Sequence, residues 1–563
     1  MAAPRFLPAG DEALLVELDS LDAVLALFRA AEADRLPGVA DLVPAARTLL
    51  VAFEPDRAPP RAVIRWLHRC LRTAAGGAAA SADAAAGRLV DIPVRYTGAD
   101  LDEVADRLGM TRAELVERHT GSDFQAAFAG FAPGFVYLTG GDACFHGLPR
   151  RPSPRTRVPA GSVAAAGEFS AVYPSDSPGG WQLLGITPVR MWDLSRAESA
   201  LVQPGCRVRF HDLDAPRVAV SLASAPSAGL AEEPPASESP ARSAAPAANL
   251  DASADLSAAS PDDEASAVRL EVRRAGLQTL FQDLGRPGLT GMGVSRSGAL
   301  DRAAMRQANR LVGNAPDAAV LENALGDLEL VCRGRAVVAV TGAQAPVSLT
   351  TAAGVRLPAA AQRALTMEDG QALRIGRVRA GVRCYVAVRG GWETEAVLGS
   401  RATDVLAGIG PAPIRAGDLL AAGRSAVAGS AEAPDAAAGG LPVSGDDVTL
   451  DVVLGPRQDW FDASARELLL SQAWQVTPQS NRVGMRLAGA RALTRSRTQE
   501  LPSEGTVVGA IQVPADGQPV LFLADHPLTG GYPVIAVVRS RHLDRLAQIP
   551  VGARLHFRAG GQS

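Results

Sequence analysis

A short arginine-rich loop is the part of the sequence where chemistry is easiest to expect. Behind the aromatic segment from Gly130 to Leu138, one histidine and four arginines stand among prolines: His146, Arg150, Arg151, Arg155 and Arg157. Proline fixes the backbone φ angle, and guanidinium groups bind phosphate or carboxylate through paired N–H donors. Histidine adds a side chain that can transfer a proton. The loop therefore predicts a stiff anion site, although a solvated basic loop paired with nearby acids has the same composition.

A glycine turn and a helix start offer two further places for an anion. The backbone N–H groups of Gly179 and Gly180 could form an anion nest in the turn that follows the loop. In the second half, Asp283 and Arg286 precede Ser297, which stands just ahead of a predicted helix whose N-terminus favours negative charge. A helix cap explains Ser297 equally well, so both interpretations stay open.

More polar side chains stand at the ends of apolar strands in the second half. Such positions often face the mouth of a barrel, where ligands bind. The candidates there are Arg389, Gln479, Arg482, Glu504, Gln512, His526 and Thr529. Those interpreted as catalytic are His146, Asp283, Ser297, Glu504 and His526. The remaining candidates are interpreted as substrate or phosphate ligands, and no metal ligand can be assigned.

The absence of lysine excludes several chemistries. All 56 basic residues are arginine. A P-loop, a Schiff-base enzyme and a biotin carrier each need a lysine amine, so we expect no covalent biotin on this chain. Phosphate binding must use arginine, backbone N–H groups or a metal. No HExxH, GxSxG or clustered His/Cys pattern occurs, which disfavours a metalloprotease or an α/β-hydrolase.

Charge and hydropathy exclude two classes of partner. The formal net charge is −4, with acids and bases interspersed, so we expect no nucleic-acid partner. There is no apolar run of about eighteen residues and no secretory signal, which predicts a cytoplasmic protein without a membrane partner. Five cysteines without CxxC spacing indicate reduced, mostly buried thiols.

Composition divides the chain into four ordered blocks. Segments rich in Ala, Pro, Ser and Gly predict a disordered linker at 221–266 and a flexible one at 421–445. The blocks are therefore expected at 1–87, 88–220, 267–420 and 446–563. A chain of this length is too long for a single hydrophobic core, and several compact units are the expectation.

Periodicity predicts a mainly β protein with α+β parts. In the first block, strands at Ala13–Glu17 and Thr48–Phe53 alternate with two amphipathic helices, which predicts a small α/β sandwich domain. The second block opens with a strand and two helices, the first of them at Leu101–Leu108. The remainder consists mostly of short strands between turn residues. The clearest helices after the second block are at Asp301–Val312 and Ser464–Ala473.

A faint internal repeat links the second and fourth blocks. The segment from Val158 to Val163 is similar to Leu501–Val507, and Ser177–Trp181 is similar to Leu528–Tyr532. Two related β-barrels follow if the similarity is real, whereas chance resemblance of Gly/Pro-rich loops is the alternative.

Longer motifs resemble a known pair of families. The segments GFAPGFVYL, LPRRPSPRTRVPAGSV and SDSPGGWQLLG, between Gly130 and Pro188, resemble the B subunit of prokaryotic 5-oxoprolinase, or KipI family. Residues 267–558, with GLQTLFQDLGRPG, VRGGW, PQSNRVGMRL and LADHPLTGGYPVIAVV, resemble the C subunit, or KipA family. The same modules occur in urea carboxylase, and such chains are often labelled allophanate hydrolase.

The resemblance implies a fold and an activity. It implies cyclophilin-like β-barrel modules behind a small N-terminal α/β sandwich. It also implies an ATP-dependent hydrolase acting on a cyclic amide, 5-oxo-L-proline, which the B and C subunits phosphorylate. A separate A subunit of the LamB/YcsF family then opens the ring to L-glutamate. ATP and Mg²⁺ are the expected cofactors, and arginines can neutralise the phosphate charge without lysine.

Two departures from the family pattern leave alternatives open. The B family usually has Gln-Thr-Gly where this chain has Phe169–Ala171, and a basic residue where it has Ile186. Both put the true substrate in doubt. A carboxyltransferase of the urea carboxylase type, with biotin on another chain, is one alternative, and a regulator of a histidine kinase is another. Self-association also stays open.

Overall fold

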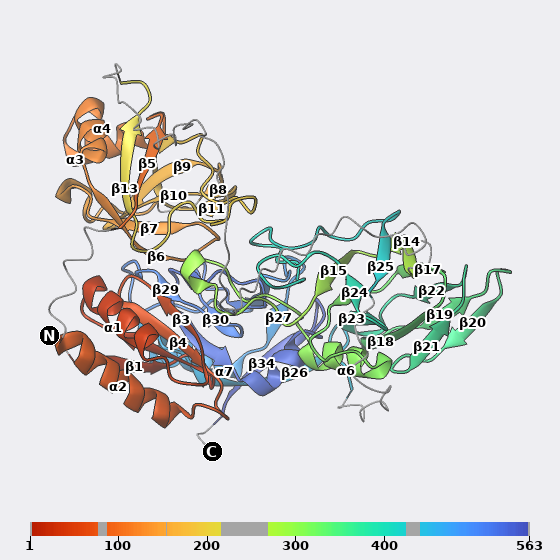
Figure 1. Ribbon diagram of the computed structural model, residues 1–563. Helices are drawn as coiled ribbons and strands as arrows, with labels where there is room; N and C mark the ends of the chain where they lie inside the picture. The colour runs from red at the N-terminus through yellow and green to blue at the C-terminus, as the bar shows by residue number, and fades with distance from the viewer. Residues whose placement is uncertain are drawn as a thin grey trace, which may run out of the picture.

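The chain folds into four modules that meet around the last of them (Figure 1). The computed structural model describes residues 3–76, 87–151, 153, 155–215, 268–423 and 440–560. The linker predicted at 221–266 lies outside the described residues, as does most of the one predicted at 421–445. We name the modules in chain order the N-terminal module, the first barrel, the sandwich and the second barrel.

The N-terminal module is a four-stranded antiparallel sheet in the order β1-β2-β4-β3 with two helices. Its strands are β1 (Arg5–Pro8), β2 (Ala13–Glu17), β3 (Val39–Pro44) and β4 (Thr48–Phe53). Its helices, α1 (Leu21–Ala33) and α2 (Pro60–Gly76), share an apolar core with one face of the sheet. Because Leu15 and Leu50 pack against Leu528 on the other face, this sheet is covered on both sides. The predicted small α/β unit is confirmed.

The first barrel is a seven-stranded sheet in the order β12-β9-β10-β7-β6-β13-β5. A bridge between Arg95 and Ile186 joins its two edges and closes the ring. Its strands are β5 (Leu89–Val94), β6 (Phe124–Ala129), β7 (Val136–Thr139), β9 (Ser162–Ala166), β10 (Phe169–Val172), β12 (Gln182–Ile186) and β13 (Arg207–Asp212). Helices α3 (Leu101–Leu108) and α4 (Arg112–Thr120) pack on it. Strands β8 (Arg155–Val158) and β11 (Ser177–Gly179) form a separate ribbon, which we call the first ribbon.

The sandwich consists of two sheets that face one another across a shared core. The first sheet contains β14 (Arg269–Ala275), β17 (Leu328–Arg333), β19 (Val347–Thr350), β20 (Arg356–Ala359), β22 (Ala372–Ile375), β24 (Trp392–Glu393) and β25 (Leu419–Ala422). The second contains β15 (Gln278–Gln282), β16 (Val320–Ala324), β18 (Ala336–Gln344), β21 (Ala364–Met367) and β23 (Ala380–Val388). Helix α6 (Arg302–Val312) covers the outer face of β18 and β23.

The second barrel is closed, with seven strands in the order β26-β33-β30-β31-β28-β27-β34. Its strands are β26 (Asp447–Leu454), β27 (Trp474–Val476), β28 (Gly484–Gly489), β30 (Ala510–Gln512), β31 (Val520–Phe522), β33 (Val534–Val538) and β34 (Arg554–Ala559). Helices α7 (Ala463–Ser471) and α8 (Leu543–Leu546) flank it. Strands β29 (Glu504–Gly505) and β32 (Thr529–Gly530) form the second ribbon.

The two barrels share one topology. In each, the first and last strands pair in parallel, and the chain visits the seven positions of the ring in the same order. In each, the third and fifth connections contribute the two strands of the ribbon. The prediction of two related barrels is therefore confirmed.

The first half of the predicted repeat is out of register. Gly161 and Gly509 occupy the same place, because each has a left-handed φ, of 81° and 83°. The N–H of Gly161 donates to the carbonyl of Tyr173 (2.8 Å), and the N–H of Gly509 donates to the carbonyl of Phe522 (2.9 Å). Each acceptor comes shortly before the second strand of its ribbon. Gly509, the structural counterpart of Gly161, therefore lies outside the segment 501–507 that was matched to it in the sequence. The second matched pair, which contains the ribbon glycines, is in register.

The described helices are short or polar, and the cysteines are unpaired. No helix in the described part of the chain is long and apolar enough to cross a membrane. All five cysteines are free thiols, and only Cys144 is not buried.

Contacts between the first and second barrels lock the two halves of the chain together. The backbone N–H of Phe131 donates to Thr529 Oγ1 (2.9 Å), and that of Gly134 donates to the carbonyl of Met292 (3.0 Å). A Cβ on Gly130 would come within 2.6 Å of Thr529 Cγ2. The loop at residues 130–134 therefore requires a bare backbone where it touches the second ribbon.

We expect Gly130→Ala to weaken this junction by about 1–3 kcal/mol, because the added methyl group overpacks it. The measurement is the apparent midpoint of urea unfolding of the full chain. Gly291→Ala is the matched control, because a Cβ there has no neighbour within 4 Å. Equal loss of stability in both variants would show that the junction is not tightly packed.

Candidate functional site

The structure gathers most of the predicted site residues into three polar clusters. The first lies on the first ribbon, the second on the second ribbon, and the third is buried between the sandwich and the second barrel. Three predicted residues lie outside these clusters: His146, Arg389 and Gln479. All three are exposed, and within the described residues their side chains make no hydrogen bond or ion pair. Their predicted roles are not tested by the structure.

The first cluster is an ion triad beneath the first ribbon, which we call the Asp100 triad. Asp100 is 1% exposed, and its Oδ1 accepts from Arg151 Nη1 and Arg155 Nη2, both at 2.6 Å. Its Oδ2 accepts from the backbone N–H of Leu183 (2.7 Å). Arg157 stands apart from the triad and pairs with Asp176 on the surface. The arginine-rich loop is therefore held by a buried carboxylate that the sequence analysis missed.

The glycines of the first ribbon do not form the expected nest. Neither Gly179 nor Gly180 has the left-handed φ that such a nest requires. Gly179 instead pairs with Arg155 in the ribbon, and the carbonyl of Gly180 accepts from the N–H of Arg151 (2.7 Å). These glycines position the two arginines, and a ligand role for them stays a prediction.

The second cluster contains an ion triad of the opposite sign, the Arg457 triad. Arg457 is 3% exposed, and its Nε lies 2.9 Å and 3.0 Å from the two carboxylate oxygens of Glu504. Its Nη2 also pairs with Glu17 of the N-terminal module (2.8 Å). Burial raises the pKa of Glu504, although the Arg457 charge opposes the shift. Glu504, predicted as catalytic, is thus bound to an arginine that also holds two modules together.

Asp100 and Arg457 occupy the same position in their barrels. The N–H of Asp100 donates to the carbonyl of Leu183, and that of Arg457 to the carbonyl of Val534, both at 3.1 Å. Leu183 and Val534 each stand on the amino-terminal side of the register shift in β12 and β33. The two charged residues therefore enter their barrels from equivalent loops.

The ribbon partners of these residues are equivalent too. Arg155 pairs with Gly179 in the first ribbon, and Glu504 pairs with Gly530 in the second. The two glycines begin the matched Gly-Gly-Trp and Gly-Gly-Tyr sequences. The same ion pair thus stands in both barrels with its charges exchanged.

The two ribbons meet at a hydrogen-bonded junction. Tyr137 donates its hydroxyl to Ser503 Oγ (3.1 Å) and lies 3.4 Å from Thr529 Oγ1. Arg150 donates to the same serine from Nη2 (3.3 Å), and its N–H donates to Glu500 (3.1 Å). Arg150 and Thr529, predicted as ligand-binding residues, therefore join the first barrel to the second.

His526 and Gln512 are buried beside this junction. His526 Nδ1 lies 3.1 Å from Thr506 Oγ1, and the imidazole stacks on Phe522. Burial lowers the pKa of His526, so the ring is neutral at physiological pH. Gln512 donates to the carbonyl of Tyr532 (3.0 Å). The neutral imidazole could accept a proton, and its predicted catalytic role stays a prediction.

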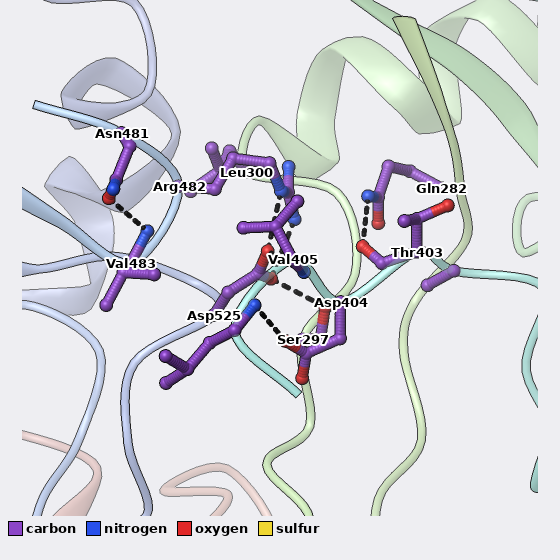
Figure 2. A network of polar contacts seen from close by, with 12 residues as sticks. Gln282, Ser297, Leu300, Thr403, Asp404, Val405, Asn481, Arg482, Val483 and Asp525 are labelled. Carbon is purple, nitrogen blue, oxygen red and sulfur yellow. Dashed lines mark hydrogen bonds and ion pairs between the residues drawn. The ribbon is translucent and has the colours of Figure 1, made fainter. Parts of the chain in front are cut away.

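The third cluster is the buried network of Figure 2, centred on Arg482. Arg482 is 2% exposed and binds both oxygens of Asp525, with Nε at 2.9 Å and Nη2 at 3.0 Å. Its Nη1 pairs with Glu322 on β16, and its Nη2 donates to the carbonyl of Gly298 (2.7 Å). This guanidinium has its donors satisfied by residues of both the sandwich and the second barrel.

Ser297 enters the same network from the sandwich. Its Oγ donates to Asp525 Oδ1 (2.6 Å), and its backbone has a left-handed φ of 54°, uncommon for a residue with a side chain. The Asp525 carboxylate therefore binds both this serine and the guanidinium of Arg482. The N-cap of α6 is Asp301 and not Ser297, because the carboxylate of Asp301 accepts from the N–H of Ala304 (2.9 Å).

Asp404 is the titratable group that sequence reasoning missed altogether. It is 1% exposed and accepts hydrogen bonds from Ser295 Oγ (3.1 Å) and from the N–H of Ala407 (2.9 Å). Burial, and then the negative charge of Asp525, raise the pKa of Asp404 to about 6. It lies between Thr403 and Val405 without any motif, so no sequence signal distinguishes it from a surface acid.

The two remaining predicted residues line a loop beside this network. Asp283 accepts from Ser400 Oγ and from the N–H of Arg401, both at 2.6 Å. Arg286 is 2% exposed and donates one N–H to the carbonyl of Ala402. Its Nε and Nη1 have no hydrogen-bond partner among the described residues. Both side chains shape the loop that leads from β15 to Ser297.

The described residues do not assemble a protein metal site. Among them, no three His, Cys, Asp or Glu side chains gather as a set of metal ligands.

Comparison with known proteins assigns related domains to both halves of the chain. The carboxyltransferase domain, subdomain C and D, matches residues 4–202. The carboxyltransferase domain, subdomain A and B, matches residues 292–559. The crystal structure of TTHA0988 is 31% identical, with a TM-score of 0.74 over 97% of this chain and 100% of that chain.

Curated relatives match the halves separately. The 5-oxoprolinase C subunit of Escherichia coli K12 is 38% identical over 291 residues, 51% of this chain and 90% of the relative. The 5-oxoprolinase B subunit of Escherichia coli O157:H7 is 44% identical over 126 residues, 22% of this chain and 57% of the relative. The urea amidolyase of Lachancea kluyveri is 31% identical over 51% of this chain but only 17% of its own length.

Arg482→Gln should destabilise the chain by about 3–5 kcal/mol, because it leaves Asp525 and Glu322 buried without their counter-charge. The apparent urea midpoint measures this loss. Arg554→Gln, which breaks an exposed pair with Asp447, should leave the midpoint unchanged. An Arg482 variant as stable as the Arg554 variant would mean that the network does not hold the modules together.

Asp404→Asn should reduce the pH dependence of stability between about 4 and 6. The folded-state pKa of about 6 lies above the ordinary value of about 4 in an unfolded chain. The folded state therefore binds the extra proton, and the wild type loses on the order of 3 kcal/mol as the pH rises through this window. Asparagine cannot ionise and removes that loss.

Urea unfolding at pH 4.5 and pH 7 measures the difference. Asp56→Asn, at an exposed position, is the control and should keep the wild-type pH dependence. Parallel behaviour of the Asp404 variant and the wild type would contradict the assignment of this titration to Asp404.

Proposed function

Because the chain belongs to the carboxyltransferase-domain family that includes the B and C subunits of 5-oxoprolinase, we propose that it activates 5-oxo-L-proline with ATP. It is a B/C-type component that carries both parts in one polypeptide. In the proposal, a separate A subunit of the LamB/YcsF family completes ring opening to L-glutamate. The family resemblance also extends the proposal to a cyclophilin-like fold for both barrels.

One observation carries the proposal: the B-like and C-like halves are interlocked, not merely tethered. Hydrogen bonds from Phe131 to Thr529 and from Arg150 to Ser503 join the B-like half to the C-like half. Glu17 completes the Arg457 triad from the opposite end of the chain. A fixed pair of halves suits two components that act on one substrate.

The chemistry requires charge neutralisation more than a covalent nucleophile. Transfer of a phosphoryl group from ATP to the lactam oxygen makes that oxygen a better leaving group before water is added. Arg151 and Arg155 carry buried N–H groups that have no partner in the described part of the chain, which fits the binding of a phosphate. A chain without lysine can hold such a group through guanidinium forks.

The roles of individual residues remain part of the proposal. Among the predicted catalytic residues, Ser297, Glu504 and His526 are buried in hydrogen-bonded clusters, whereas His146 is exposed. Buried polar groups with defined partners can be pre-positioned for chemistry, but they can also be purely structural. Kinetics of single variants will separate these possibilities.

A urea carboxylase-type activity is the second candidate. The match to the urea amidolyase of Lachancea kluyveri over half of this chain favours it. Because the chain contains no lysine, biotin would have to be carried by another protein. The 5-oxoprolinase proposal takes precedence, since 90% of the matched C subunit is covered, against 17% of the urea amidolyase.

Reconstitution tests the function directly. The full chain, mixed with its A-subunit partner, should form glutamate and ADP from 5-oxoproline and ATP, and either protein alone should not. The parallel reaction supplies urea, ATP and a biotinylated carrier protein. ADP release without glutamate in the first reaction, or turnover only in the second, would overturn the proposal.

A further inference from the structure

The Asp100 triad is chemically incomplete. Arg151 Nε and Arg155 Nη1 are buried and have no hydrogen-bond partner among the described residues. Ser177 Oγ, on the same ribbon, is also buried without a partner there. An unsatisfied buried donor destabilises the folded state, and more so when the donor is charged. The two guanidinium groups share one buried carboxylate, because the other acid beside them, Glu103, is exposed and lies 3.8 Å from Arg151 Nη1.

The second barrel shows what a completed version of this arrangement looks like. In the Arg457 triad, Glu504 of the second ribbon and Glu17 of the N-terminal module both pair with the central arginine. None of the buried polar atoms of these three side chains lacks a partner. Because the two triads occupy equivalent positions, the orphaned donors of the first barrel are a specific departure, not a general property of this fold.

We propose that the Asp100 triad binds a small oxyanion, a carboxylate or a phosphate. Such a group accepts several hydrogen bonds at once and brings a negative charge to the guanidinium groups, which a water molecule cannot do. Charge-assisted bonds from arginine to these oxygens are among the strongest that proteins make.

The triad can be reached from solvent although Asp100 is enclosed. The side chains of Arg155 and Arg151 are 23% and 32% exposed, whereas that of Asp100 is 1% exposed. An arriving anion can therefore reach the exposed part of each arginine side chain. Holding both guanidinium groups on one carboxylate keeps them in place before the ligand arrives.

A buried acceptor in the same barrel restricts the chemistry of the ligand. Gln182 Oε1 is buried without a partner among the described residues, while its Nε2 donates to the carbonyl of Pro149 (2.9 Å). A ligand that satisfies all of these atoms carries anionic oxygens and an N–H or O–H donor. If the proposed function holds, 5-oxoproline offers both in its carboxylate and lactam N–H, and the phosphates of ATP are the other source.

Titration of the full chain without its A-subunit partner tests the site independently of turnover. Inorganic phosphate, 5-oxoproline and ATP are the probes, each measured calorimetrically at constant ionic strength. At least one should bind, and Arg155→Gln and Arg151→Gln should each weaken its binding about 10- to 100-fold. The probe that loses affinity identifies the source of the oxyanion.

Two variants are controls for a loss of binding that has a cause other than the triad. Arg209→Gln removes an arginine from an exposed pair with Asp123 in the same barrel and should bind as the wild type does. Arg155→Lys keeps the charge without the planar fork, so it should retain part of the affinity and an unchanged melting temperature.

The proposal fails if no probe binds the wild-type chain, or if Arg155→Gln and Arg151→Gln bind as tightly as Arg209→Gln. Failure of the 5-oxoprolinase activity is a separate result. Phosphate bound through these arginines, without glutamate formation in the reconstituted reaction, would keep the site and remove the function.

Discussion

The guanidinium group of Arg482 fixes the geometry on which the rest of the molecule depends. It is buried, and it binds Asp525 of its own barrel and Glu322 of the sandwich. A charge in such surroundings is tolerated only when every partner is in place, so small displacements are costly. The loops that carry Ser297, Asp404 and Asp525 are held in one arrangement, and the second barrel keeps a defined orientation for the contacts it makes with the first.

Periodicity was sufficient to predict most of the framework. Strand β2 and helix α3 have the predicted limits, since alternating and helical apolar patterns are unambiguous there. Strands β1 and β3 were not predicted. The first is short and ends at a proline, and the second includes Asp41 on a half-exposed edge. Both strands owe their form to pairing with neighbours, a tertiary effect that local sequence does not contain.

The site was predictable in its residue types but not in its pairings. The arginine-rich loop, Glu504 and Arg482 were identified because charged residues near turns and strand ends are conspicuous. Their counter-ions were not, because Asp100 lies 55 residues before Arg155, and Arg457 lies 47 before Glu504. Only closure of the barrels brings these residues together. If the two repeats had been aligned in the correct register, the loop after β5 would have matched the loop after β26. Asp100 and Arg457 would then have been recognised as equivalent residues.

The exchanged charges of the two triads have a consequence for how the chain assembles. Two barrels with the same strand order on one polypeptide invite exchange of equivalent segments during folding. A second ribbon placed on the first barrel would bring Glu504 against Asp100, and the reverse swap would bring Arg155 against Arg457. Like charges in buried positions repel strongly. Each ribbon therefore matches only its own barrel, and the sign of one side chain distinguishes correct from incorrect assembly.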